Sequence, residues 1–138
     1  MISWAQQTLE RMTLEEKAGQ VFILSQFSFD EKSVVNMLDQ ICRLKLGGIF
    51  QFHVNQNRLS EVIDTYQKSV DIPLLVAADY EVGTGWTIRD GFRMPRQMVR
   101  GCVGDEQAEY KIGEITGKQG RAAGVTVTFS PLLDLNSH

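Results

Sequence analysis

The stretch PLLVAADYEVG, residues 73–83, decides the fold, because an unbroken apolar run leads directly into a carboxylate and then a glycine. Pro73 forces any preceding helix to end, since the residue before a proline avoids the helical region. Leu74–Ala78 predicts a strand that is apolar on both faces, which is typical of a parallel sheet between layers of helices. Asp79 is therefore expected at the rim of this sheet, where it can accept hydrogen bonds from a polar ligand.

Further apolar runs predict strands of the same kind, and amphipathic segments separate them. The expected strands cover residues 21–24, 49–52 and 125–129, and the expected helices cover residues 33–45, 59–70 and 108–123. Gly47 and Gly48 are expected to stop the first of these helices. Along the last one, Gly113, Gly117 and Gly120 are expected to allow close backbone approach.

Two short helices are expected before the first strand. Ser3 with Gln6 and Thr13 with Glu16 fit the capping-box pattern, in which a hydroxyl and a side-chain acceptor reciprocally satisfy exposed N–H groups. Gly19 is expected to end the second of these helices.

The alternation of strand and helix predicts an α/β fold built of parallel βα units, with both faces of the sheet covered. The first three strands begin about 26 residues apart, close to the roughly 30 per unit of a ~250-residue eightfold barrel. A complete barrel would need nearly twice the 138 residues present. The alternatives are an open sheet and the first half of a barrel. Residues 131–138 look like the start of a strand-end loop, which favours the first half of a barrel. Residues 1–138 are then a single incomplete domain.

Composition excludes several classes of function. The chain is 43% hydrophobic and 22% charged, with a formal net charge of −3, as in ordinary globular proteins. Its 14 basic and 17 acidic residues are scattered, so neither nucleic acid nor a membrane surface is an expected partner. The N-terminus lacks the pattern of a secretory signal, so a cytoplasmic location is expected. Cys42 and Cys102 are too few for a disulfide framework, and no metal or organic cofactor is indicated.

Functional residues of parallel α/β folds gather beyond the carboxyl ends of the strands. The polar residues at these places are Ser25 and Gln26, His53 and Asn55, Asp79 and Glu81, and Ser130 and Asp134. Asp79 is the most informative of them. It either binds a polar ligand, or it only caps a turn or pairs with Arg89. His53 is a single histidine at a strand end, for which a structural role is favoured over catalysis.

Segments in order along the chain resemble family 3 glycoside hydrolases. They are LERMTLEEKAGQ at 9–20, GGIF at 47–50, PLLVAADYE at 73–81, Met94-Pro95, the stretch 113–124, and FSPLLDLN at 129–136. The similarity covers essentially all 138 residues. It implies a (β/α)8 barrel of which this chain supplies the first half.

The resemblance also implies an activity, retaining hydrolysis of a β-linked sugar from a non-reducing end. It is greatest to the β-N-acetylhexosaminidase branch, with β-glucosidases as the near alternative. Asp79 matches the aspartate that binds sugar hydroxyls, and an ionised carboxylate makes hydrogen bonds about twice as strong as neutral ones. Arg89 is a candidate for the basic residue that follows this motif, and Asp134 is a further candidate for substrate binding.

Departures from the family pattern limit what this chain can do alone. Val82 replaces a glycine, and Thr84 stands at the position of an arginine. The family's nucleophilic aspartate and its general acid lie beyond the fourth strand, and retention needs both groups. No catalytic residue is therefore expected in this chain, and the chain alone is expected to be inactive.

The expected half sheet ends in an exposed edge, and such an edge invites pairing with another chain. Self-association, or a partner polypeptide that brings the second half, is therefore expected besides a carbohydrate substrate. The alternative function is a non-catalytic α/β module that binds carbohydrate or a partner and forms half of a two-chain barrel.

Overall fold

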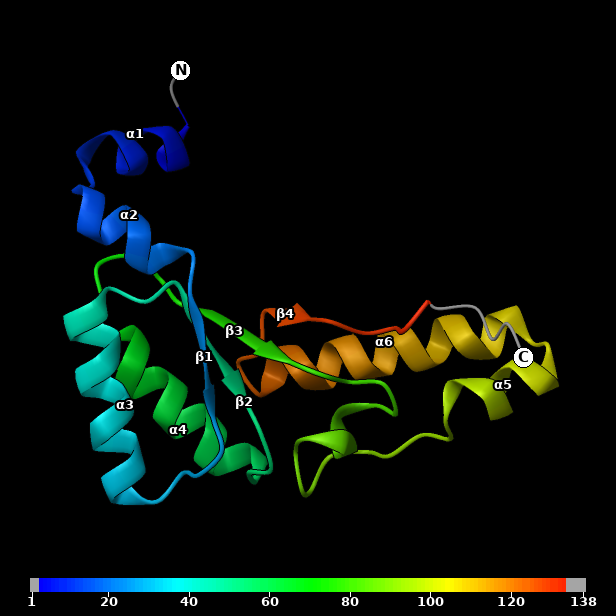
Figure 1. Cartoon of the computed structure of the whole chain (residues 1–138). Coiled ribbons are helices and arrows are strands. Elements are labelled where there is room, and N and C mark those ends of the chain that lie inside the picture. Colours follow the sequence, from blue (N-terminus) through cyan, green and yellow to red (C-terminus); the bar gives the residue numbers. More distant parts are fainter. Residues whose placement is uncertain (1–2, 134–138) are drawn as a thin grey trace, which may run out of the picture.

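The computed structural model describes residues 3–133, which contain a four-stranded parallel sheet in the order β1-β2-β3-β4. The strands are β1 (Ile23–Gln26), β2 (Gly48–Gln51), β3 (Leu75–Ala78) and β4 (Val127–Thr128). The main connecting helices are α3 (Glu31–Leu44), α4 (Gln56–Gln67) and α6 (Glu106–Ala122), and each returns the chain for a parallel strand (Figure 1). The predicted α/β fold of parallel βα units is thus confirmed.

Both predicted capping boxes are present. In the first, the Gln6 N–H donates to Ser3 Oγ at 3.3 Å, and the Ser3 N–H donates to Gln6 Oε1 at 3.0 Å. In the second, the Thr13 N–H donates to Glu16 Oε2 at 2.8 Å, a bond that lowers the pKa of Glu16. These boxes begin α1 (Trp4–Arg11) and α2 (Leu14–Gln20), which lead from the N-terminus toward the sheet in Figure 1.

The first strand begins two residues later than predicted. Val21 is the C-cap of α2 and keeps a helical conformation, so the chain enters the sheet only at Ile23. Val21 and Phe22 are consequently 77% and 58% exposed, although their apolar character predicted burial. Apolar composition alone therefore misplaced the boundary of β1.

The end of α3 also differs from the prediction. Lys45, not Gly47 or Gly48, takes the left-handed cap, with φ of 54°. The glycines serve close packing instead, because a Cβ on Gly47 would lie 2.0 Å from the Gln20 carbonyl oxygen, and one on Gly48 would lie 2.4 Å from that of Leu75.

The core lies on one face of the sheet, where β2 and β3 meet α3 and α4. Ile49 and Val76 point into it from the strands and are almost completely buried. Helix residues complete the cluster, among them Ile41, Leu59, Val62, Ile63 and Tyr66. The buried Gln26 amide donates to the Tyr66 hydroxyl at 3.0 Å, so the polar groups of this layer satisfy one another.

The prediction that both faces of the sheet are covered is wrong for the described residues. Leu75 is 49% exposed on the face opposite the core. Ile23 lies on the same face, because Ile23 and Leu75 both pair with Gly48. An eightfold barrel explains this difference, since its strands turn one face to the helices and the other to the barrel interior. We call this opposite side the open face.

The connection between β3 and α6 contains two elements that the sequence did not predict, η1 (Thr84–Trp86) and α5 (Gln97–Val103). On α6, the predicted close approach occurs at Gly120, where a Cβ would lie 2.7 Å from the Tyr80 ring. Added Cβ atoms at Gly113 and Gly117 would meet no atom of the described chain within 4 Å.

Candidate functional site

Asp79 directly follows β3 and is half-buried. Residues two apart in an extended segment share a face, so Asp79 follows Leu75 and Ala77 on the open face. Within residues 3–133 its carboxylate makes no hydrogen bond and no ion pair, and the suggested pairing with Arg89 is therefore wrong. A carboxylate without an internal partner at this place is available to a ligand.

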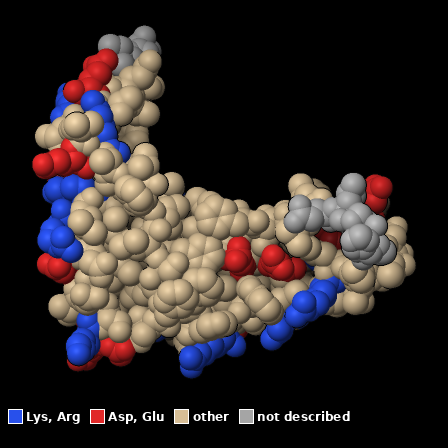
Figure 2. Space-filling view, in the orientation of Figure 1, with Lys and Arg blue, Asp and Glu red and all other residues tan. Residues whose placement is uncertain are grey.

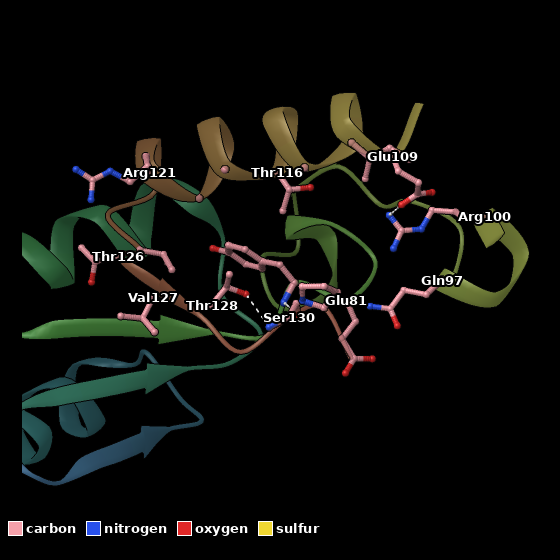
Figure 3. Close-up of a pocket in the computed structure, with 17 residues that line it drawn as sticks. Glu81, Gln97, Arg100, Glu109, Thr116, Arg121, Thr126, Val127, Thr128 and Ser130 are labelled. Carbon is pink, nitrogen blue, oxygen red and sulfur yellow. Dashed lines mark hydrogen bonds and ion pairs between the residues drawn. The ribbon is translucent and has the colours of Figure 1, made fainter. Parts of the chain in front are cut away.

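The residues on either side of Asp79 are fixed by β4. The Phe129 N–H donates to the Ala78 carbonyl at 3.2 Å, and the Tyr80 N–H donates to Ser130 Oγ at 2.8 Å (Figure 3). Because these bonds hold the backbone before and after it, the Asp79 side chain is carried by a rigid segment.

Glu81 lies in a tight turn, in which the Gly83 N–H donates to the Tyr80 carbonyl at 3.0 Å. Glu81 lines a cavity of about 330 Å³ beside β4 and α6, to which Asp79 does not contribute (Figure 3). Arg100 and Glu109 form an ion pair of 3.1 Å at the far end of this cavity and join α5 to α6. Asp79 and Glu81 therefore do not line this cavity together.

Arg89 lies in a loop that packs against the end of β2. Its N–H donates to the Val54 carbonyl at 2.9 Å, and the Val54 N–H donates to the Thr87 carbonyl at 3.2 Å. The next residue, Asp90, accepts from the Gln56 N–H at 2.8 Å and so caps α4. The Arg89 side chain is exposed and forms no ion pair in the described part of the chain. Its role in binding stays a prediction.

Three further predicted positions are His53, Gln26 and Asp134. His53 is exposed with φ of 47°, a left-handed conformation at the exit of β2, and its structural role stays a prediction. Gln26 belongs to the buried core layer. Asp134 lies outside the described residues.

Polar side chains behind the sheet hold the loop after Asp79 in place. Gln51 is fully buried and its amide donates to Thr87 Oγ1 at 2.7 Å, while Thr84 Oγ1 donates to Gln119 Oε1 on α6 at 2.7 Å. Thr84 thus anchors the loop where the family pattern has an arginine. Burial raises the pKa of the Tyr80 hydroxyl.

Sequence reasoning missed a row of aromatic side chains on the open face. Phe27 and Phe52 stack with ring centroids 4.8 Å apart, Phe50 lies 4.7 Å from Phe52, and Phe50 stacks on Phe129 at 5.7 Å. We call these four residues the phenylalanine row. The alternating sequence Phe50-Gln51-Phe52 was the available signal, because alternation places both rings on one face.

The charged side chains on one face of the molecule form no large block of a single sign. Figure 2 shows Lys and Arg interspersed with Asp and Glu, and the side over the sheet is mostly uncharged. No helix within residues 3–133 is long and apolar enough to cross a membrane. In the same range, no group of three or more His, Cys, Asp or Glu side chains is placed to hold a metal ion.

Known proteins are similar to this chain in sequence and in fold. It is 26% identical over 136 residues to a β-N-acetylglucosaminidase/β-glucosidase of Cellulomonas fimi, covering 98% of this chain and 23% of that protein. It is 32% identical over 107 residues to a β-hexosaminidase of Nitrosomonas eutropha, covering 70% of this chain and 31% of the relative. The chain thus spans less than a third of the length of these relatives.

Solved structures agree. A structure described as β-glucoside phosphorylase BglX bound to 2FGlc superposes with a TM-score of 0.86 at 26% identity, over 96% of this chain and 24% of the other. NagZ from Neisseria gonorrhoeae, at 23% identity, shares the fold with a TM-score of 0.63, over 83% of this chain and 37% of NagZ. The sequence profile of the glycosyl hydrolase family 3 N-terminal domain matches residues 13–138. The chain therefore belongs to glycoside hydrolase family 3.

Proposed function

We propose that this chain is the N-terminal half of a (β/α)8 glycosidase domain that removes β-linked N-acetylglucosamine or glucose from non-reducing ends, with retention of configuration. The observation that carries this proposal is the Asp79 carboxylate, which follows β3 on the open face and has no partner in the described chain. One relative is named a β-N-acetylglucosaminidase/β-glucosidase and another a β-hexosaminidase, which supports the choice of substrate.

Asp79 is proposed to bind substrate rather than to catalyse. A carboxylate without an internal partner can accept two hydroxyl donors of a sugar, and such charge-assisted bonds are short and strong. Burying these donors without their acceptor would leave them unsatisfied, which costs about 1–3 kcal/mol for each group. Loss of the carboxylate should therefore weaken sugar binding sharply.

Retention requires a nucleophile and a separate general acid on the two sides of the scissile bond. Glu81 does not supply either one beside Asp79, because it lines the cavity at β4 and α6. We therefore assign both catalytic groups to the second half of the barrel. The open face and the unpaired edge of β4 provide the surface on which that half would pack.

The 138-residue chain alone is accordingly expected to be inactive. An unpaired strand edge beside exposed apolar side chains favours association, either with a second copy or with a polypeptide that carries the missing half. Light scattering of the purified chain tests this, and a monodisperse monomer would contradict both forms of association.

Phosphorolysis of β-glucosides is the second candidate activity. It is favoured by the superposition on the β-glucoside phosphorylase BglX over nearly the whole chain, with a TM-score of 0.86. The two activities use the same sugar and differ in the group that completes the reaction, water or phosphate. Product analysis with and without inorganic phosphate distinguishes them, since only phosphorolysis yields a sugar phosphate.

The deciding experiment uses the complete protein that contains this chain. Wild-type protein and Asp79→Asn are assayed with nitrophenyl β-N-acetylglucosaminide and nitrophenyl β-glucoside. We expect turnover by the wild type and a loss of kcat/KM of roughly 100-fold or more in the variant, which corresponds to about 3 kcal/mol. Asp90→Asn is the matched control, because Asp90 caps α4 instead.

Unchanged kinetics of Asp79→Asn would overturn the role of this carboxylate. Failure of the wild type to release either sugar, combined with binding of the free sugar, would favour the non-catalytic module.

A further inference from the structure

The register of the sheet places Asp79 in one layer with three phenylalanines. One residue from each strand pairs across the sheet, in the order Ser25, Phe50, Ala77 and Val127. Two residues later on each strand, and therefore on the same face, come Phe27, Phe52, Asp79 and Phe129. Asp79 is thus the only polar member of the layer, with an aromatic ring on each side of it.

Backbone hydrogen bonds support this layer beyond the strand ends. The Phe52 N–H donates to the Gln26 carbonyl at 3.1 Å and the Phe129 N–H donates to the Ala78 carbonyl at 3.2 Å, so the pairing of β1 with β2 and that of β3 with β4 each continue past the strand ends. The layer is therefore ordered by backbone pairing rather than by the side chains alone.

Ala77 allows the rings to meet across β3. Phe50 and Phe129 come from the strands on either side of it, yet their rings are nearly parallel and 5.7 Å apart. Ala77 lies on the open face between the strands that carry these two rings, and it is fully buried. A larger side chain at this position would separate them, so the small residue in β3 helps to build an aromatic surface around Asp79.

We propose that Phe52 and Phe129 form an apolar platform for the C–H face of the sugar ring whose hydroxyls bind Asp79, and that this platform sets the affinity for pyranoses. A pyranose has a polar edge of hydroxyls and faces that carry axial C–H groups. One carboxylate between aromatic rings matches both parts, as in ligand pockets where apolar walls surround a few placed polar groups. The assignment depends on the proposed function, which supplies the sugar.

A purely structural role predicts different behaviour. If the rings only filled the interior of a barrel, shortening them would lower stability without a specific effect on sugar binding. Phe129 is 59% exposed and Phe27 is 71% exposed in the described chain, and both lie at the carboxyl ends, where barrel enzymes bind substrates. These positions favour contact with a ligand.

The test uses the complete protein that contains this chain, with Phe129→Leu, Phe129→Tyr and the control Phe22→Leu. Phe22 precedes β1 and is also exposed, but it lies outside the phenylalanine row. For Phe129→Leu we expect KM for both methyl and nitrophenyl β-glycosides to rise roughly five- to tenfold, as for loss of about 1–1.5 kcal/mol of aromatic contact. Phe129→Tyr keeps the ring and should therefore raise KM less than Phe129→Leu does, whereas the control Phe22→Leu should stay within about twofold of the wild type.

Calorimetric binding of free N-acetylglucosamine and glucose provides a second measurement that needs no turnover. The same rise in Kd is expected for Phe129→Leu. An unchanged KM and Kd with a lowered melting temperature would overturn the platform and leave the glycosidase assignment intact. A loss confined to the nitrophenyl substrate would also overturn it, because the ring would then contact the leaving group. Absence of turnover with normal sugar binding would instead count against the proposed function alone.

Discussion

The two faces of the sheet differ in what they already contact. On the core face, Ile49 and Val76 are almost completely buried against α3 and α4. On the open face, Leu75 is half exposed and Phe129 more than half exposed, although these side chains are no less apolar. The same short strands therefore serve two purposes. One face supplies the stability of these units, and the other supplies a surface for the remainder of a barrel and for a ligand.

Core truncation should show the largest contrast between the faces. We expect Ile49→Ala to lower the free energy of unfolding of this chain by about 2–5 kcal/mol, because Ile49 is fully buried. Leu75→Ala on the open face is the control and should cost less than about 1 kcal/mol in the same chain. Urea unfolding measures both. Equal losses would show that the open face is buried in solution, for example by self-association.

The close packing around β2 predicts the next largest effect. Gly48→Ala should destabilise the chain by about 1–3 kcal/mol, because its Cβ would lie 2.4 Å from the Leu75 carbonyl oxygen and force the strands apart. Gly113→Ala is the matched control in the exposed part of α6, where it should stabilise by up to about 1 kcal/mol. Opposite signs in thermal unfolding are expected, and a neutral Gly48→Ala would contradict the observed strand spacing.

The smallest expected effect is a change in stability at acidic pH. Hydrogen bonds from the Ser28 hydroxyl, and then from Ser33, lower the pKa of Asp30 from 3.8 to about 2 at the start of α3. A lowered carboxylate pKa contributes stability above the unfolded value, and that contribution is lost as pH falls from about 4 to 2. Asp30→Asn should remove this part of the pH dependence and still cap the helix. Stability is followed against pH by circular dichroism. An equal loss of stability between about pH 4 and 2 in the wild type and the variant would show that Asp30 is not its cause.

Local rules predicted much of this fold, and long-range packing explains the misses. The capping boxes at Ser3 and Thr13 depend on residues three apart, so the sequence alone contains the full signal. The start of β1 depends on how α2 ends against Gly47, which lies far away in the chain. Helix α5 was missed because its N-cap, Arg96, makes no side-chain capping bond.

The candidate site shows the same division. The place of Asp79 followed from the apolar run before it, because strand ends gather the functional groups of such folds. Its lack of a partner could not be predicted, since Arg89 is drawn instead to Val54 at the end of β2. The phenylalanine row required the register between strands, which no single stretch of sequence contains.

The capping of α4 by Asp90 has a consequence for how this fold can be recombined. The first turn of that helix takes its N-terminal acceptor from the loop of the following unit, across 34 residues of sequence. Successive units therefore overlap, and a boundary drawn at Pro73 would separate a helix from its own cap. Chimeras between relatives should be joined after Asp90, so that each inherited helix arrives with the acceptor that begins it.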